Sequence, residues 1–308
     1  MKIFKYICYF IFFLLFANNL NAKIEIIYKV NNEIITNIDI ENEKKYLIFL
    51  RPSLNKIPSK EMTNLAENSL IREIIKKKEL DRVFNKKIDS KFIKEIESNL
   101  FKFKKVKNEK EFKELLKKNK MSYKKIVEKM KYEALWNELI YMKYNSSIKI
   151  NKKKLRNSLE IKLLNTKKYE LNLSEILFEV DVDEDFENKY NKIKLYIKNN
   201  DFKTAAIKYS IANSSTKGGE IGWIKETLLS QEILKILNKK KIGSITRPIK
   251  YPNGYLLLKI NKKKEMKQTI DKEKELSDLI KFEKNKQLNQ FSLLLYKKLK
   301  QNIVINEF

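Results

Sequence analysis

The sequence predicts an α+β protein in which a mainly helical domain carries an inserted α/β domain. Residues 37–165 contain no glycine, and apolar residues recur there at the three-and-four spacing of helices. Every glycine of the chain lies in one later window, residues 218–254. The segments beside this window show the alternation of residue types that is typical of strands. Short strand-like segments occur near both ends of the chain, so we expect them to pair and to close the helical domain around the insertion.

Residues 1–22 are predicted to be a secretory signal peptide. Lys2 and Lys5 precede an apolar run of 11 residues, Ile7 to Ala17, and Ala22 offers a small residue for cleavage. The run is shorter than the roughly 20 residues that span a bilayer. Cleavage after Ala22 predicts a periplasmic protein, whereas an uncleaved N-terminus would give a membrane-anchored folding factor.

Residues 23–168 are expected to form the helical domain. A strand at 24–30 leads into a hairpin at 30–35, where Asn31-Asn32 suits left-handed turn angles. A first helix follows at 37–50, and Ser59 is the expected N-cap of the second. The apolar spacing continues through further helices to about residue 164. The aromatic residues between Tyr123 and Tyr144 belong either in the core or on a peptide-binding surface.

Residues 169–263 are expected to form the inserted domain. A strand at 169–180 is followed by two helices, the second capped by Asp201 and running to Tyr209. The glycine stretch, a short helix carrying Leu229 and Ile233, and strands at 244–250 and 255–260 complete the domain. The order βααβαββ predicts a small α+β domain around an antiparallel sheet.

Residues 264–308 are expected to return to the helical domain. A charged helix at 268–300 is about 45 Å long at 1.5 Å per residue. The tail Ile303-Val304-Ile305 reads as a strand, and the strand at 24–30 is its expected partner.

The composition excludes most kinds of active site. The chain has no histidine and one cysteine, Cys8, so it cannot build a disulfide, a thiolate metal site or a Ser-His nucleophile. We expect no metal and no cofactor, and no glycine-rich phosphate loop indicates nucleotide use. The net charge of +28 indicates either a solvated lysine-rich surface or attraction to acidic polypeptides and anionic membranes. We expect no nucleic-acid binding, because the charge is not gathered in a basic arm.

Four motifs carry a family resemblance. Leu173-Ser174-Glu175-Ile176-Leu177, Tyr209-Ser210, Gly218-Gly219-Glu220-Ile221-Gly222-Trp223 and Gly254-Tyr255-Leu256-Leu257-Leu258-Lys259 together resemble a parvulin-type prolyl isomerase domain. The hairpin at 30–35, the helices after it and the returning C-terminal helix resemble the SurA-like periplasmic chaperones. The resemblance implies a SurA-like chaperone with a single inserted parvulin-type domain.

The chain departs from the parvulin pattern at three positions. Parvulins have histidines where this chain has Glu175 and Leu256, and a cysteine or aspartate where it has Ala212. The resemblance implies that Leu229 and Ile233 line the proline pocket, and Trp223 is a further candidate for substrate binding. Glu175 is either a solvated carboxylate at a strand end or a substitute polar member of the site.

The resemblance and these departures favour an ATP-independent periplasmic chaperone over an enzyme. Its expected partners are unfolded outer-membrane β-barrel proteins or other proline-containing and aromatic-rich polypeptides, with peripheral contact to anionic membranes. The alternative is an active peptidyl-prolyl cis-trans isomerase. Isomerisation needs no nucleophile, only an environment that favours the twisted amide, so the loss of the polar cluster does not forbid it.

Overall fold

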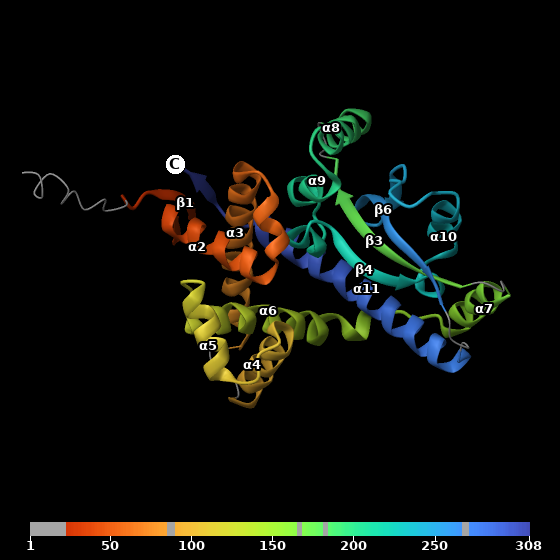
Figure 1. Cartoon of the computed structure of the whole chain (residues 1–308), viewed down its shortest axis with the longest axis horizontal. Helices are drawn as coiled ribbons and strands as arrows, with labels where there is room; N and C mark the ends of the chain where they lie inside the picture. Colours follow the sequence, from red (N-terminus) through yellow and green to blue (C-terminus); the bar gives the residue numbers. More distant parts are fainter. Residues whose placement is uncertain (1–22, 85–89, 165–167, 181–183, 267–270) are drawn as a thin grey trace, which may run out of the picture.

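The computed structural model describes residues 23–84, 90–164, 168–180, 184–266 and 271–308. The predicted signal peptide, residues 1–22, lies outside these residues. Helices from the first half of the chain form one domain, and the inserted domain lies beside it (Figure 1). The last helix, α11 (Lys272–Gln301), runs beneath the inserted domain and returns to the first one. This is the α+β arrangement that the sequence predicts.

A small sheet joins the two ends of the described chain. Strands β1 (Ile26–Val30) and β2 (Glu33–Thr36) form the predicted hairpin, and Asn31 takes a left-handed φ of 52° in its turn. Strand β7 (Ile305–Glu307) adds to the other edge of β1, so the sheet order is β2-β1-β7. The predicted pairing of the two ends is therefore confirmed, although β7 begins at the residue where the predicted strand ends.

Helices α2 to α6 build the helical domain, whereas α7 packs against α11 beside the inserted domain (Figure 1). The predicted first helix has the predicted bounds, and Thr36 caps it reciprocally with Asp39, because each side chain accepts the other's backbone N–H. Ser59 lies inside the second helix as its first residue, so its prediction as an N-cap was wrong. The helices are α2 (Asn37–Leu50), α3 (Ser59–Phe84), α4 (Ser90–Lys104), α5 (Glu109–Lys118), α6 (Tyr123–Tyr144) and α7 (Lys152–Leu163), with 3-10 turns η1 (Pro52–Lys56) and η2 (Asn145–Ser147).

The inserted domain has the predicted order of elements. They are β3 (Tyr169–Phe178), α8 (Phe186–Asn199), α9 (Phe202–Tyr209), η3 (Asn213–Lys217), β4 (Glu220–Lys225), η4 (Glu226–Leu228), α10 (Gln231–Asn238), β5 (Ile249–Tyr251) and β6 (Gly254–Glu265). All strand pairs are antiparallel, in the order β4-β3-β6-β5. Asp201 caps α9 as predicted, since its carboxylate accepts the N–H of Thr204.

Helix α11 completes the core of the helical domain. Its Leu295 is buried with Leu80, Leu135, Trp136 and Leu139. The indole N–H of Trp136 donates to the Ser292 hydroxyl at 2.9 Å, so α11 is also tied to α6 by a buried hydrogen bond. The returning helix is thus part of the helical core rather than a surface appendage.

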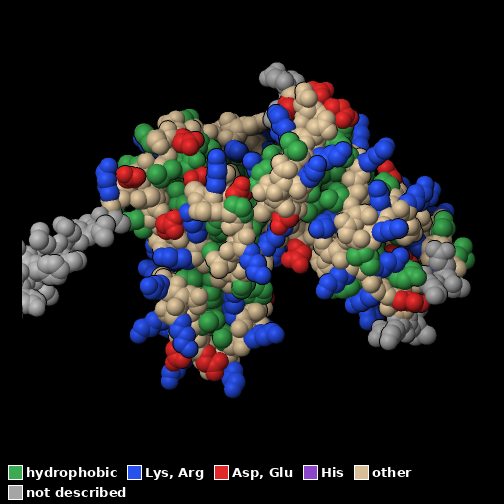
Figure 2. All heavy atoms as spheres, turned by 45° about the horizontal axis from the view of Figure 1, so that its top comes forward, with side chains coloured by type: hydrophobic (Ala, Val, Ile, Leu, Met, Phe, Trp, Pro, Cys, Tyr) green, Lys and Arg blue, Asp and Glu red, His purple; other side chains and the backbone are tan. Residues whose placement is uncertain are grey.

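Positive charge is spread over the surface. Figure 2 shows lysine and arginine side chains on both lobes of the visible face, with acidic side chains interspersed. Among the described helices, none combines the length and apolarity that crossing a bilayer requires.

Candidate functional site

A large cleft lies between the two domains. Its volume is about 1230 Å³, and α2, α3 and α6 contribute one side while the inserted domain contributes the other. Helices α7 and α11 supply further lining residues. A volume of this size exceeds what a single drug-sized ligand fills, so the cleft suits a stretch of polypeptide.

The inserted domain gives the cleft an aliphatic wall. Its members come from β3, β4, β6, α10, the loop before η3 and the loop between η4 and α10, and most also belong to the core of that domain. The aliphatic wall consists of Leu173, Leu177, Ala212, Ile224, Leu229, Ile233, Leu256 and Leu258. The structure therefore brings together four of the residues singled out in the sequence, namely Ala212, Leu229, Ile233 and Leu256.

Glu175 is the polar group beside this wall. It lies in the middle of β3, opposite Leu258 of β6, so its interpretation as a solvated carboxylate at a strand end was wrong. Its Oε1 accepts the Ser214 hydroxyl at 2.8 Å. Burial raises the pKa of the Glu175 carboxyl, and the bond from Ser214 opposes that shift only partly. Glu175 and Ser214 are thus a hydrogen-bonded polar pair among aliphatic side chains.

The Tyr209-Ser210 motif fixes the loop that carries Ala212. The Ser210 hydroxyl accepts the backbone N–H groups of Leu177 at 3.0 Å and of Ala212 at 3.3 Å. Ser210 is buried, so both donors would lack a partner without it. This serine holds the loop against β3.

The glycine stretch lets η3 and β4 approach β3 closely. Gly219 has a φ of 77°, and its carbonyl accepts the N–H of Glu175 at 2.7 Å. A Cβ at this position would lie 2.2 Å from the Glu175 carbonyl oxygen and 2.8 Å from the Ala206 Cβ. Only glycine fits here, because both the backbone angle and the contact exclude a side chain.

Trp223 is not among the residues that line the cleft. It lies on β4 with 43% of its surface exposed, and the Lys264 ammonium is 4.4 Å from the ring centroid. The lysine and the ring form a cation–π contact on the surface of the sheet. The structure therefore separates this candidate from Leu229 and Ile233.

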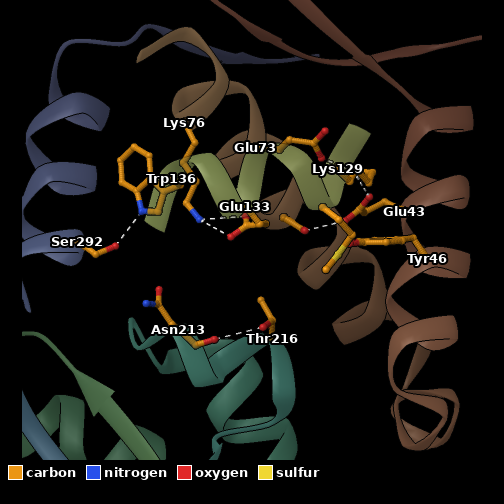
Figure 3. A network of polar contacts seen from close by, with 12 residues as sticks. Glu43, Tyr46, Glu73, Lys76, Lys129, Glu133, Trp136, Asn213, Thr216 and Ser292 are labelled. Carbon is orange, nitrogen blue, oxygen red and sulfur yellow. Dashed lines mark hydrogen bonds and ion pairs between the residues drawn. The ribbon is translucent and has the colours of Figure 1, made fainter. Parts of the chain in front are cut away.

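The opposite side of the cleft is a charged wall, which we define as Glu43, Tyr46, Arg72, Glu73, Lys76, Lys129 and Glu133. Lys129 pairs with Glu43 at 2.7 Å and also with Glu73. Lys76 donates to both carboxylate oxygens of Glu133 at 3.0 Å. Figure 3 shows these pairs on the helices, with Asn213 and Thr216 of η3 across from them.

Burial and ion pairing have opposite effects on the pKa values of the two lysines in the charged wall. Burial favours a lower pKa for Lys129, but Glu43 and Glu73 outweigh it and raise the pKa of the ammonium. At Lys76 burial is the larger effect and lowers the pKa, although Glu133 opposes it. Lys129 therefore stays charged as the cation between two carboxylates.

Polar contacts hold the two domains in place around the cleft. Arg51 pairs with Glu220 at 3.5 Å and also donates to the Lys217 carbonyl. The Lys203 ammonium donates to the Ser53 carbonyl at 2.9 Å. These contacts join η1 and the adjacent Arg51 to the glycine stretch and to α9, so they fix one edge of the cleft.

A second junction lies where α7 and α11 meet η4. Lys162 is 4% exposed, and its ammonium donates to the carbonyls of Thr227 at 2.7 Å and Leu229 at 2.6 Å. The Thr227 hydroxyl donates to Glu275 of α11 at 2.7 Å. Lys162 therefore holds the backbone of Leu229, which belongs to the aliphatic wall.

The charged wall was missed in the sequence. Its residues come from three helices, and their meeting depends on tertiary packing. A signal did exist, because Glu73 and Lys76 flank Ile74 and Ile75 within an apolar stripe. Within the described residues, no group of three or more His, Cys, Asp or Glu side chains is arranged to hold a metal ion.

Comparison with known proteins identifies the inserted domain. Residues 172–262 match the Rotamase family, described as the PPIC-type PPIase domain. The periplasmic chaperone PpiD of Buchnera aphidicola is 42% identical over 109 residues, which are 35% of this chain and 17% of PpiD. The chaperone SurA of Pseudomonas putida is 39% identical over 64 residues, 21% of this chain and 15% of SurA. The matched segments are thus a small part of those relatives.

A solved Campylobacter jejuni structure, from the pair PEB4 and Cj1289 described as SurA-like chaperones, aligns over 92% of this chain and 98% of its own. It is 18% identical with a TM-score of 0.39. Residues 172–262 therefore form a PPIC-type, parvulin-like domain.

Proposed function

We propose that this protein is an ATP-independent periplasmic chaperone that holds unfolded outer-membrane proteins in the cleft between its domains. The observation that carries the proposal is the aliphatic wall, which faces a cleft large enough for a polypeptide segment. Unfolded β-barrel proteins expose alternating apolar side chains, which such a wall can bind weakly and release again.

The site favours binding over catalysis. Of the three positions where parvulins have polar groups, Ala212 and Leu256 have apolar side chains that are at least 95% buried. Only Glu175 can form hydrogen bonds through its side chain. An isomerase must lower a barrier of about 18–20 kcal/mol by binding the twisted amide more tightly than the planar amide. A nearly apolar pocket has few groups that could distinguish the two amide conformations.

The relatives and the leader sequence support the location and the class of activity. The matched proteins are named periplasmic chaperone PpiD, chaperone SurA and foldase protein PrsA 2. A signal peptide at residues 1–22 would bring the chain to the same compartment. The excess of lysine on the surface would add peripheral attraction to anionic membranes and to acidic segments of clients.

Aggregation of a urea-unfolded outer-membrane β-barrel protein tests the proposal. Light scattering after dilution from urea should fall when the purified protein lacking residues 1–22 is present in several-fold excess. Ile233→Ser should weaken this effect, because Ile233 lines the cleft. Leu195→Ser makes the same change at an exposed position of α8, 58% exposed, and should leave it intact. Undiminished aggregation with the unaltered protein would refute the proposal.

The alternative is an active prolyl isomerase, and one observation favours it. Glu175 and Ser214 leave a hydrogen-bonding pair in the cleft beside Leu229 and Leu256. A protease-coupled assay on a proline peptide distinguishes the two functions. A rate well above the uncatalysed one, lost in Glu175→Ala, would establish the isomerase; a background rate supports the chaperone.

A further inference from the structure

Buried polar side-chain atoms without a hydrogen-bond partner are gathered in the cleft. Within the described residues four atoms have this property, Glu43 Oε2, Arg72 Nε, Gln231 Nε2 and Asn253 Nδ2. All four residues line the cleft. Buried polar groups are nearly always hydrogen-bonded, since an unpaired one destabilises the fold. A ligand bound in this cleft could therefore supply the missing partners.

Two of the four atoms have compensating neighbours. Glu43 Oε2 lies 2.7 Å from the Lys129 ammonium, so the carboxylate is ion-paired. The Arg72 guanidinium lies over the Tyr296 ring, 5.5 Å from its centroid. The unpaired groups that remain to be explained are the two amides of the inserted domain, Gln231 and Asn253.

Both amides line the same cleft as the aliphatic wall. Asn253 follows Pro252 in the turn between β5 and β6, and 8% of its surface is exposed. Gln231 is the first residue of α10, two residues after Leu229. Each side chain therefore places an amide NH₂ donor beside the apolar residues against which a client would lie.

An extended polypeptide has the acceptors that these donors lack. Its main chain presents a carbonyl at every residue, whereas a helix has already used its carbonyls in its own hydrogen bonds. A proline residue has a carbonyl but no N–H, so it brings no donor that would compete with the two amides for the carbonyls of the client. Donors beside an aliphatic wall thus fit an extended segment, with its carbonyls on the amides and its apolar side chains on the wall.

We propose that Asn253 and Gln231 bind main-chain carbonyl oxygens of an extended client segment whose apolar side chains contact the aliphatic wall. The inference rests on the proposed function, because it specifies how a client is held in the same cleft. Main-chain carbonyls are common to all sequences, so these contacts select an extended conformation and tolerate many client sequences.

Leucine substitutions test the proposal, since leucine matches both amides in size but has no polar atom. The probe is a fluorescein-labelled peptide of repeated Ala-Pro units, which is extended without internal hydrogen bonds. Asn253→Leu and Gln231→Leu should each weaken its Kd by about fivefold, measured by fluorescence anisotropy. Asn191→Leu makes the asparagine change at an exposed residue of α8 that does not line the cleft, and it should not weaken binding.

Thermal unfolding separates ligand binding from a structural role. Removing a donor that has no partner in the free protein should leave the Tm unchanged or raise it. A Tm that falls in both variants, or a Kd within about twofold of the unaltered protein, would overturn the inference while leaving the chaperone proposal standing. Absence of both peptide binding and aggregation suppression in the unaltered protein would instead overturn the proposed function.

Discussion

Replacing Lys129 with methionine should destabilise the protein strongly. Lys129 is the cation between Glu43 and Glu73 in the charged wall of the cleft. The Glu43 side chain is 1% exposed, so water cannot replace the lost ammonium there. Methionine keeps the length and apolar stem of the side chain but leaves two carboxylates without their cation.

The expected loss follows from the burial of the carboxylates. Removing one partner of a buried ion pair costs about 3–5 kcal/mol, because the charge that remains is uncompensated. Ser69 still donates to Glu43 at 2.6 Å, which places the expected loss toward the lower end, at about 3 kcal/mol. That is a large part of the stability of a typical domain.

Urea unfolding followed by circular dichroism measures the loss, with Lys124→Met as the matched control. Lys124 is exposed on the same helix, so this variant removes the same charge at a cost of at most about 0.5 kcal/mol. Burial already raises the pKa of Glu73, and loss of Lys129 raises it further. The deficit should therefore be largest near pH 7 and shrink toward pH 4 as the carboxylate is protonated. A deficit equal to the control's, or one independent of pH, would refute this reasoning.

Two further predictions concern the inserted domain and its junction. Burial lowers the pKa of Lys162 to about 8, below the unfolded value of about 10.4. Between these two pKa values the unfolded chain binds more protons than the folded protein. The free energy of unfolding should therefore rise between about pH 8 and pH 10, by on the order of 1–3 kcal/mol. Urea unfolding of Lys162→Met should not show this rise. Gly219→Ala should destabilise the protein by at least about 2 kcal/mol more than Gly222→Ala. Both substitutions place alanine at a strained positive φ, but only at position 219 do other atoms lie within 4 Å of the new Cβ. Equal denaturation midpoints for the two glycine variants would contradict the steric argument.

Local signals predicted the elements well. The start of α2 is set by the capping pair Thr36 and Asp39, which is local in sequence. The order βααβαββ follows from Asp201, the glycines and the alternation of strands, and each acts within a few residues. Ser59 was misjudged because an N-cap and a first helical residue differ only in backbone angles, which a serine beside Pro58 does not determine.

The site was predicted only in part. Ala212, Leu229 and Leu256 were found because motifs of the inserted domain place them at known positions. Their companions on the other side of the cleft lie on α2, α3 and α6, far earlier in the chain, and no local pattern pairs Lys129 with Glu43. Trp223 does not line the cleft, which the sequence could not show, because conformity to a motif does not reveal to which side of a sheet a ring turns.

The sheet that joins β1 to β7 has a consequence for the order of folding. Val30 pairs with Ile305, so the first strand gains its second neighbour only after nearly the whole chain has been made. The inserted domain pairs its strands within residues 169–265 and can form earlier. Contacts of such long sequence separation form slowly. Until α11 has been made, side chains of the helical domain that pack against it, such as Leu80 and Leu139, therefore stay uncovered.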